Sequence, residues 1–140
     1  MKHLLLDVDV VLDVLLDRRP HVGVAGALWA AGERGACRLS LSAHAVTTIF
    51  YLASRQRDAK SARAAVEALL AVFTVATVDE KVLRRAATLE MPDFEDAVTA
   101  AAAERAGCDA VVTRNLADYD ASPLSAIDPA TALAWLEVGE

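Results

Sequence analysis

The opening stretch, in which three leucines at residues 4–6 run into Asp7 and Asp9, constrains this chain more than any other feature. Consecutive leucines are typical of a strand buried on both faces, as in a parallel sheet covered by helices. A carboxylate inside such a run would carry a large desolvation cost. The two aspartates therefore mark the place where the strand leaves the core, and we expect them at the exposed end of a sheet.

Composition narrows the class of protein. A chain of 140 residues is the size of one ordinary domain, and 55% hydrophobic content with only 5% aromatic residues favours close-packed helices against a sheet. No segment approaches the roughly 18 apolar residues that span a bilayer, and the first residues lack a signal-like pattern. We therefore expect a cytoplasmic protein without a membrane partner, whose two cysteines, Cys37 and Cys108, are reduced thiols.

A net charge of −6 argues against a protein that binds duplex nucleic acid through a broad basic face, but it leaves RNA binding open. Acids that gather at one site would account for part of this excess. Bound divalent cations would then reverse the local sign of the charge.

Strand-like and helix-like segments alternate along the chain. This alternation predicts an α/β fold: one domain over residues 1–140 with a mostly parallel central sheet of four to five strands flanked by helices. Strands are expected at 4–6, 37–41, 73–78, 110–113 and, as an edge strand, 124–127. Helices are expected at 10–16, 21–34, 42–55, 59–71, 79–89, 93–106 and from 128 to about 136.

Acidic side chains from three distant segments should meet at one edge of this sheet. A helix that leads into a parallel strand runs antiparallel to it, so its first turn lies at the edge where the strands end, which is where ligands bind in open α/β sheets. The side chains placed there are Asp7 and Asp9 after the first strand, Asp93, Glu95 and Asp96 in the helix before the fourth strand, and Asn115 and Asp118 after the fourth strand.

Carboxylates that are brought together repel one another unless protons or cations compensate. Oxygen ligands without nearby histidine or cysteine suit a hard cation, Mg²⁺ or Mn²⁺, rather than zinc. The chemistry that fits such a site is metal-assisted phosphoryl transfer or phosphodiester hydrolysis.

Three segments also carry a family resemblance. They are Leu5-Leu6-Asp7-Val8-Asp9-Val10-Val11-Leu12-Asp13, Asp93-Phe94-Glu95-Asp96-Ala97 and Val112-Thr113-Arg114-Asn115-Leu116-Ala117-Asp118-Tyr119. In their order and spacing the chain resembles PIN domains, and specifically the VapC-type toxins of toxin-antitoxin pairs. The resemblance implies a Mg²⁺-dependent ribonuclease acting on RNA, a cognate antitoxin that blocks the site, and a homodimer. It also implies that Asp7 and Asp96 are central metal ligands and that Asn115 or Asp118 completes the site.

Two positions depart from the family pattern. Asp9 stands where the family usually has asparagine, and Thr48 stands where many members carry a glutamate. A hydroxyl is a much weaker magnesium ligand than a carboxylate. We therefore expect Asp9 or Asp93 to support the metal in place of that glutamate.

Two other functions fit parts of the sequence. A PIN module that binds RNA or a protein without cleavage would account for Thr48 and Asp9. The segment from Asp7 to Asp13 also resembles the first motif of haloacid-dehalogenase-type phosphatases, in which Asp7 would be the nucleophile and Asp9 the acid/base. Such enzymes need a lysine near a strand end, and neither Lys60 nor Lys81 is clearly in such a position.

Several residues have simpler interpretations. Asp93 and Asp96 suit the first turn of a helix for capping and dipole reasons alone. Asp13 is expected on a solvated helix face, and Trp29 is expected to pack in the core. Core packing is also the simplest interpretation of Tyr51, with a dimer face as the alternative.

Overall fold

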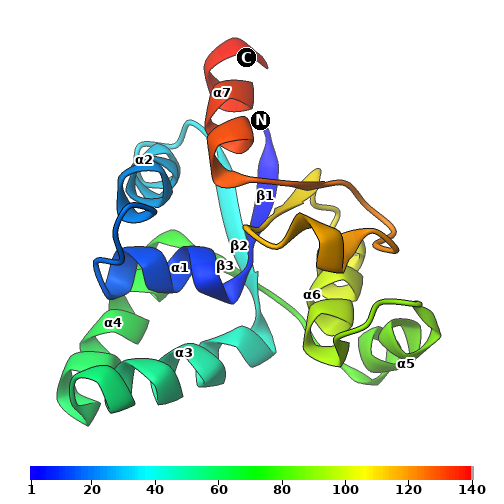
Figure 1. The fold of residues 1–140 in the computed structure, drawn as a ribbon, viewed down its shortest axis with the longest axis horizontal. Coiled ribbons are helices and arrows are strands. Elements are labelled where there is room, and N and C mark those ends of the chain that lie inside the picture. The colour runs from blue at the N-terminus through cyan, green and yellow to red at the C-terminus, as the bar shows by residue number, and fades with distance from the viewer. Residues whose placement is uncertain (140) are drawn as a thin grey trace.

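The structure is a computed structural model that describes residues 1–139. Within this range the chain forms one five-stranded sheet in which every pair of neighbouring strands is parallel (Figure 1). The strands are β1 (His3–Leu6), β2 (Arg38–Ser42), β3 (Thr74–Ala76), β4 (Ala110–Val112) and β5 (Ala126–Ile127), in the spatial order β3-β2-β1-β4-β5. The predicted α/β class with a parallel central sheet is confirmed, and the predicted fifth strand is the edge strand, although it is shorter than expected.

Helices connect the strands and cover both faces of the sheet. They are α1 (Val8–Leu15), α2 (Val22–Glu33), α3 (Ala43–Gln56), α4 (Ala59–Val72), α5 (Glu80–Thr88), α6 (Phe94–Arg105) and α7 (Pro129–Gly139), with a short 3-10 helix η1 (Leu116–Tyr119) after β4. No helix in the described range is long and apolar enough to cross a membrane.

The alternation of side chains along β1 divides the core between the two faces. Leu4 and Leu6 are buried in one cluster with residues of α1, α2, α3 and α7. Leu5 is buried on the other face in a cluster with Val111 and the alanine-rich side of α6. Figure 1 shows α1, α2 and α4 on one side of the sheet and α5 and α6 on the other. Because β1 is covered on both faces, its carboxyl end is the place where the chain leaves the core.

Aspartates start several of the helices, as the sequence predicts. The side chain of Asp79 accepts from the backbone N of Val82 at 3.0 Å and starts α5. Asp93 accepts from the backbone N of Asp96 at 3.1 Å and starts α6. Gly107 follows the end of α6 with a φ of +75°, a conformation that glycine adopts without a steric cost. These two boundaries fix α6 so that its first turn lies at the carboxyl edge of the sheet.

The expectation that Asp13 lies on a solvated helix face is wrong. Its side chain is fully buried, and it accepts two hydrogen bonds from Arg114, from Nε at 2.9 Å and from Nη2 at 3.3 Å. Arg18 lies 3.8 Å from the same carboxylate. The charge is tolerated because an arginine that follows β4, 101 positions away in the sequence, satisfies it.

The two aromatic predictions have different outcomes. Trp29 packs edge-on against Phe73, with the ring centroids 5.0 Å apart, so its predicted packing role is confirmed. Tyr51 is 56% exposed on α3, so core packing is wrong for this residue. Both cysteines are free thiols, Cys37 buried and Cys108 half-buried.

Candidate functional site

A cavity of about 280 Å³ opens at the carboxyl edge of the sheet. The junction of β1 and α1, the first turns of α3 and α6, and the segment after β4 all contribute to its wall. The lining residues are Asp7, Val8, Asp9, His44, Thr48, Asp93, Glu95, Asp96, Thr99, Asn115 and Asp118. All seven acidic and amide side chains that were predicted to share one sheet edge therefore line the same cavity.

Asp7 is held rigidly at the floor of this arrangement. Its backbone N donates to the carbonyl of Val112 at 2.9 Å, which continues the β1–β4 pairing by one residue. Its carboxylate accepts from the backbone N of Val8 at 2.8 Å and from the hydroxyl of Thr113 at 3.0 Å. Burial raises the pKa of Asp7, and the hydrogen bond from Thr113 opposes this rise. Asp7 is only 8% exposed, and its carboxylate is oriented by the start of α1 and by the residue that follows β4.

Asp96 approaches the cavity from the first turn of α6. Burial, followed by the charges of Asp7, Asp93 and Asp118, raises the pKa of Asp96 to about 7. The hydroxyl of Tyr119 donates to Asp96 Oδ1 at 3.4 Å. Burial raises the pKa of Tyr119, so this hydroxyl remains a proton donor. The carboxylates of Asp7 and Asp96 therefore interact electrostatically although 89 positions separate them in the sequence.

Two further predicted ligands have second roles. Asp93 is the N-cap of α6, so its simpler structural interpretation is correct, and its side chain lines the cavity as well. Asp9 lies on the first turn of α1, where Nη1 of Arg18 approaches its carboxylate at 3.4 Å. This pair is partly exposed, so its contribution to stability is small. Asp9 is consequently the one carboxylate of the cavity wall with an arginine beside it among the described residues.

Other residues of the site were not among the ligands predicted from the sequence. His44 and Thr48 line the cavity from α3, one helical turn apart, and Nδ1 of His44 is buried without a hydrogen-bond partner among residues 1–139. Their spacing of four residues, directly after a strand that ends at the same edge, was the available signal. Thr113 and Tyr119 position carboxylates, and both lie inside the third resembling segment. Neither Lys60 nor Lys81 lines the cavity in the part of the chain that is described.

The donor set suits a hard divalent cation. Six carboxylates and one amide line the cavity, and burial together with the neighbouring acids raises the pKa of Asp96. Within the described residues, no three carboxylate, imidazole or thiol groups meet in a preformed metal cage. Magnesium does not require one, because it is usually held by one or two carboxylates and keeps several waters. The residues present therefore fit Mg²⁺ or Mn²⁺ by their chemistry.

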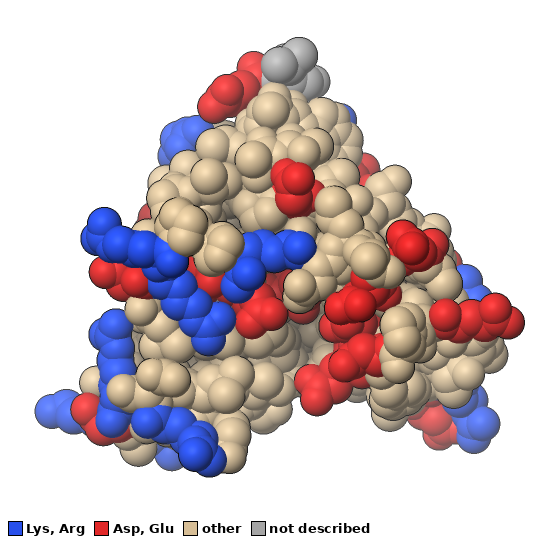
Figure 2. All heavy atoms as spheres, viewed as in Figure 1, with Lys and Arg blue, Asp and Glu red and all other residues tan. Residues whose placement is uncertain are grey.

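Charge is distributed unevenly around the cavity. Figure 2 shows acidic side chains gathered on the α5–α6 side of this face and basic side chains gathered over α1 to α4, with a hollow between them. A polyanion that lies across this face can contact the basic side with its phosphates while one phosphate meets a cation among the acids.

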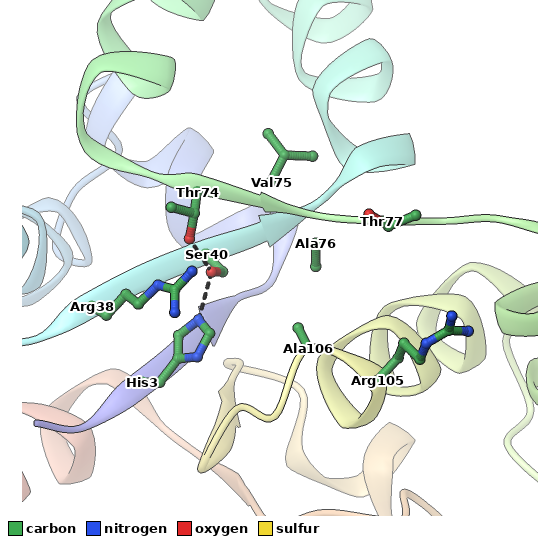
Figure 3. A pocket seen from close by; sticks show the side chains of 9 residues that line it. All are labelled: His3, Arg38, Ser40, Thr74, Val75, Ala76, Thr77, Arg105 and Ala106. Atoms are coloured by element: carbon green, nitrogen blue, oxygen red, sulfur yellow. Dashed lines mark hydrogen bonds between the residues drawn. The ribbon is translucent and has the colours of Figure 1, made fainter.

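A second cavity, of about 320 Å³, lies near the amino ends of the strands, away from the Asp7 edge (Figure 3). Its polar side chains bond to one another: His3 Nε2 lies 2.6 Å from Ser40 Oγ, which lies 2.7 Å from Thr74 Oγ1. Burial lowers the pKa of His3, with a smaller effect in the same direction from Arg38. Because these groups satisfy each other, they form a structural network.

With an all-parallel five-stranded sheet and a cavity of carboxylates at its carboxyl edge, this chain is an α/β domain that gathers acidic side chains at one end of its sheet. The profile described as "PIN domain" matches residues 3–117. The chain belongs to the PIN domain family.

Solved structures of VapC-type proteins share this fold. DNA-bound VapBC from Salmonella typhimurium gives a TM-score of 0.70 at 18% identity, over 90% or more of both chains (92% and 99%). VapBC2 from Rickettsia felis, bound to a promoter fragment, gives 0.69 at 12% identity over 90% of this chain and 98% of that one. VapC20 from Mycobacterium tuberculosis, a Sarcin-Ricin loop cleaving toxin, gives 0.63 at 19% identity over 77% and 86%. A comparison with curated proteins finds no match.

Proposed function

We propose that this chain is a divalent-metal-dependent endoribonuclease and the toxin of a toxin-antitoxin pair, folded as one PIN-like nuclease domain over residues 1–140. The observation that carries the proposal is the cavity in which Asp7 and Asp96 meet four other carboxylates at the carboxyl edge of the sheet. The structural similarity to VapC20, a Sarcin-Ricin loop cleaving toxin, supports RNA as the substrate class.

Asp7 and Asp96 would hold Mg²⁺ or Mn²⁺, with Asp9 and Asp93 close enough to assist and Asn115 and Asp118 completing the wall. When bound, the cation would neutralise the charge that develops on the scissile phosphate and lower the pKa of the attacking water. Neighbouring groups of the protein orient the carboxylates of Asp7 and Asp96. Thr113 and the backbone N of Val8 fix the Asp7 carboxylate, and Tyr119 holds one oxygen of Asp96.

Two of the neighbours with this fold are VapBC complexes, which supports an antitoxin partner for this chain. We further propose that the protein acts in the cytoplasm, where such a partner and RNA are both present, and that it is a homodimer. Size-exclusion chromatography with light scattering tests the dimer, and co-expression with the product of a small neighbouring gene tests the antitoxin.

The test of activity uses the purified chain with labelled single-stranded RNA and with a generic phosphomonoester, in Mg²⁺, in Mn²⁺ and in chelator. Metal-dependent cleavage of RNA by the wild type, with a loss of about 100-fold or more in Asp96→Asn, is the expected result. The exposed acid Glu67 on α4 provides the matched control Glu67→Gln, which should cleave normally.

Two alternatives have distinct outcomes in the same test. Tight RNA binding without turnover in any metal would indicate a module that binds without cleavage, the interpretation favoured by Thr48 on the cavity wall and by the Asp9–Arg18 pair. Hydrolysis of the phosphomonoester that depends on Asp7 would indicate the phosphatase instead.

A further inference from the structure

One face of α3 continues from the cavity to the outside of the molecule. His44, Thr48, Tyr51 and Arg55 are spaced by four, three and four residues, so they form one stripe along the helix. The first two line the cavity and the last two are exposed. With a rise of 1.5 Å per residue, the stripe extends about 16 Å from His44 to Arg55.

The outer end of this stripe pairs an aromatic ring with a guanidinium group. Nη1 of Arg55 donates to the hydroxyl of Tyr51 at 2.8 Å, and its guanidinium carbon lies 5.6 Å from the ring centroid. Tyr51 is 56% exposed. Arg55 has no carboxylate partner within residues 1–139, whereas the exposed Arg84 of α5 is paired with Glu80 at 2.7 Å. Arg55 thus has a free positive charge beside an open ring.

The surroundings of the stripe are basic. Arg57, Lys60 and Arg63 lie at the end of α3 and in the first turns of α4, and Arg63 stacks 5.5 Å from the ring of Phe50. Figure 2 shows basic side chains over this part of the molecule, opposite the acids of the α5–α6 side. Aromatic rings that alternate with cations form the kind of surface on which single-stranded nucleic acid stacks its bases and places its phosphates.

We propose that the His44–Thr48–Tyr51–Arg55 stripe is the track along which a single-stranded RNA substrate leaves the cavity, with an unpaired base on Tyr51 and a backbone phosphate at Arg55. The inference rests on the proposed ribonuclease function, since it starts from a scissile phosphate among the carboxylates. It adds two residues that bind the substrate outside the cavity. A protein segment on the same stripe is the competing occupant.

The experiment measures RNA binding separately from cleavage. Fluorescence anisotropy with a labelled mixed-sequence single-stranded RNA is recorded in the Asp96→Asn background, with Tyr51→Ala, Tyr51→Phe, Arg55→Ala or the control Arg84→Ala added. We expect Tyr51→Ala to weaken binding about tenfold or more and Tyr51→Phe to bind nearly as the background does, because stacking needs only the ring. Arg55→Ala should lower the slope of log K against log salt by about 0.7, the value for one phosphate contact on a single strand.

Arg84→Ala removes the same charge from another face and should leave both quantities unchanged. Thermal unfolding checks that the exposed substitutions leave the fold intact.

The result separates the two proposals. If the wild type cleaves RNA but Tyr51→Ala and Arg55→Ala bind it with unchanged affinity and salt slope, the track is overturned in favour of a protein contact, and the ribonuclease function stands. If the wild type neither binds nor cleaves single-stranded RNA with Mg²⁺ or Mn²⁺, the proposed function fails and the track fails with it.

Discussion

The hydroxyl of Thr113 donates a hydrogen bond to Asp7 at 3.0 Å, between two neighbouring strand ends that are 106 positions apart in the sequence. Both residues are buried, and the backbone N of Asp7 pairs with the residue that precedes Thr113. Asp7 is therefore oriented by the segment that follows β4. The same segment contributes Asn115 and Asp118 to the site.

Replacing Thr113 by valine keeps the shape of the side chain but removes the donor to Asp7. Because a buried acceptor then lacks one partner, we expect the free energy of unfolding to fall by about 1–3 kcal/mol and the pKa of Asp7 to rise further. Urea denaturation measures the first effect. Thr113→Ser keeps the hydroxyl and serves as the control, and an unchanged midpoint in Thr113→Val would contradict the structural role given to this bond.

Arg114 holds the fully buried carboxylate of Asp13. Arg114→Met leaves that charge with Arg18 alone, at 3.8 Å, so we expect a loss of about 3–5 kcal/mol. The double variant Asp13→Leu/Arg114→Met removes both charges and should recover most of this loss. Denaturant unfolding of the single and double variants checks the prediction, which fails if the two losses are equal.

Acid pH should stabilise the metal-free protein. The pKa of Asp96 is about 7 in the folded state and about 3.9 in an unfolded chain, so the folded state binds the proton more tightly and its stability falls as pH rises between these values. Asp7, whose pKa is also raised, acts in the same direction. The lowered pKa values of Asp58, Asp79 and Asp128 act in the opposite direction, but only at more acidic pH. The lowered pKa of His3 also acts in the opposite direction, below about pH 6.5, so the effect of Asp96 is read from the difference between the wild type and Asp96→Asn.

Urea denaturation in chelator at about pH 5 and about pH 8 measures this dependence. Asp96→Asn should flatten it and should be more stable than the wild type at the higher pH, because the amide carries no charge to bury beside Asp7. An equal pH dependence in the wild type and in Asp96→Asn would contradict the raised pKa of Asp96.

Divalent cations should offset the electrostatic repulsion among the carboxylates of the cavity. Mg²⁺ at 100 times its dissociation constant would raise the free energy of unfolding by about 2.7 kcal/mol, and chelator would return it to the metal-free value. Thermal unfolding measures the shift. Asp7→Asn and Asp96→Asn should lose it, whereas Glu67→Gln, an exposed change on α4, should keep it; an equal shift in all four proteins would indicate nonspecific binding.

The sequence alone determined the fold class and the position of the acidic side chains at one edge of the sheet. The leucines before Asp7 indicate a doubly covered strand, and alternating strands and helices require parallel connections that bring strand ends and helix starts to one edge. The placement of Asp96 opposite Asp7 follows from these local rules, without knowledge of any side-chain contact.

Only the tertiary structure decided which side chains are buried and what satisfies them. A helical repeat assigns Asp13 to a face of α1 but does not say that Arg114 covers that face, and nothing local to Tyr119 indicates that its hydroxyl reaches Asp96. The sequence also did not indicate that Tyr51 is exposed, or that Arg55 beside it has no carboxylate partner within residues 1–139. The physical reason is that burial and hydrogen bonding depend on the partner that packs opposite a residue, and here that partner is often about a hundred positions away.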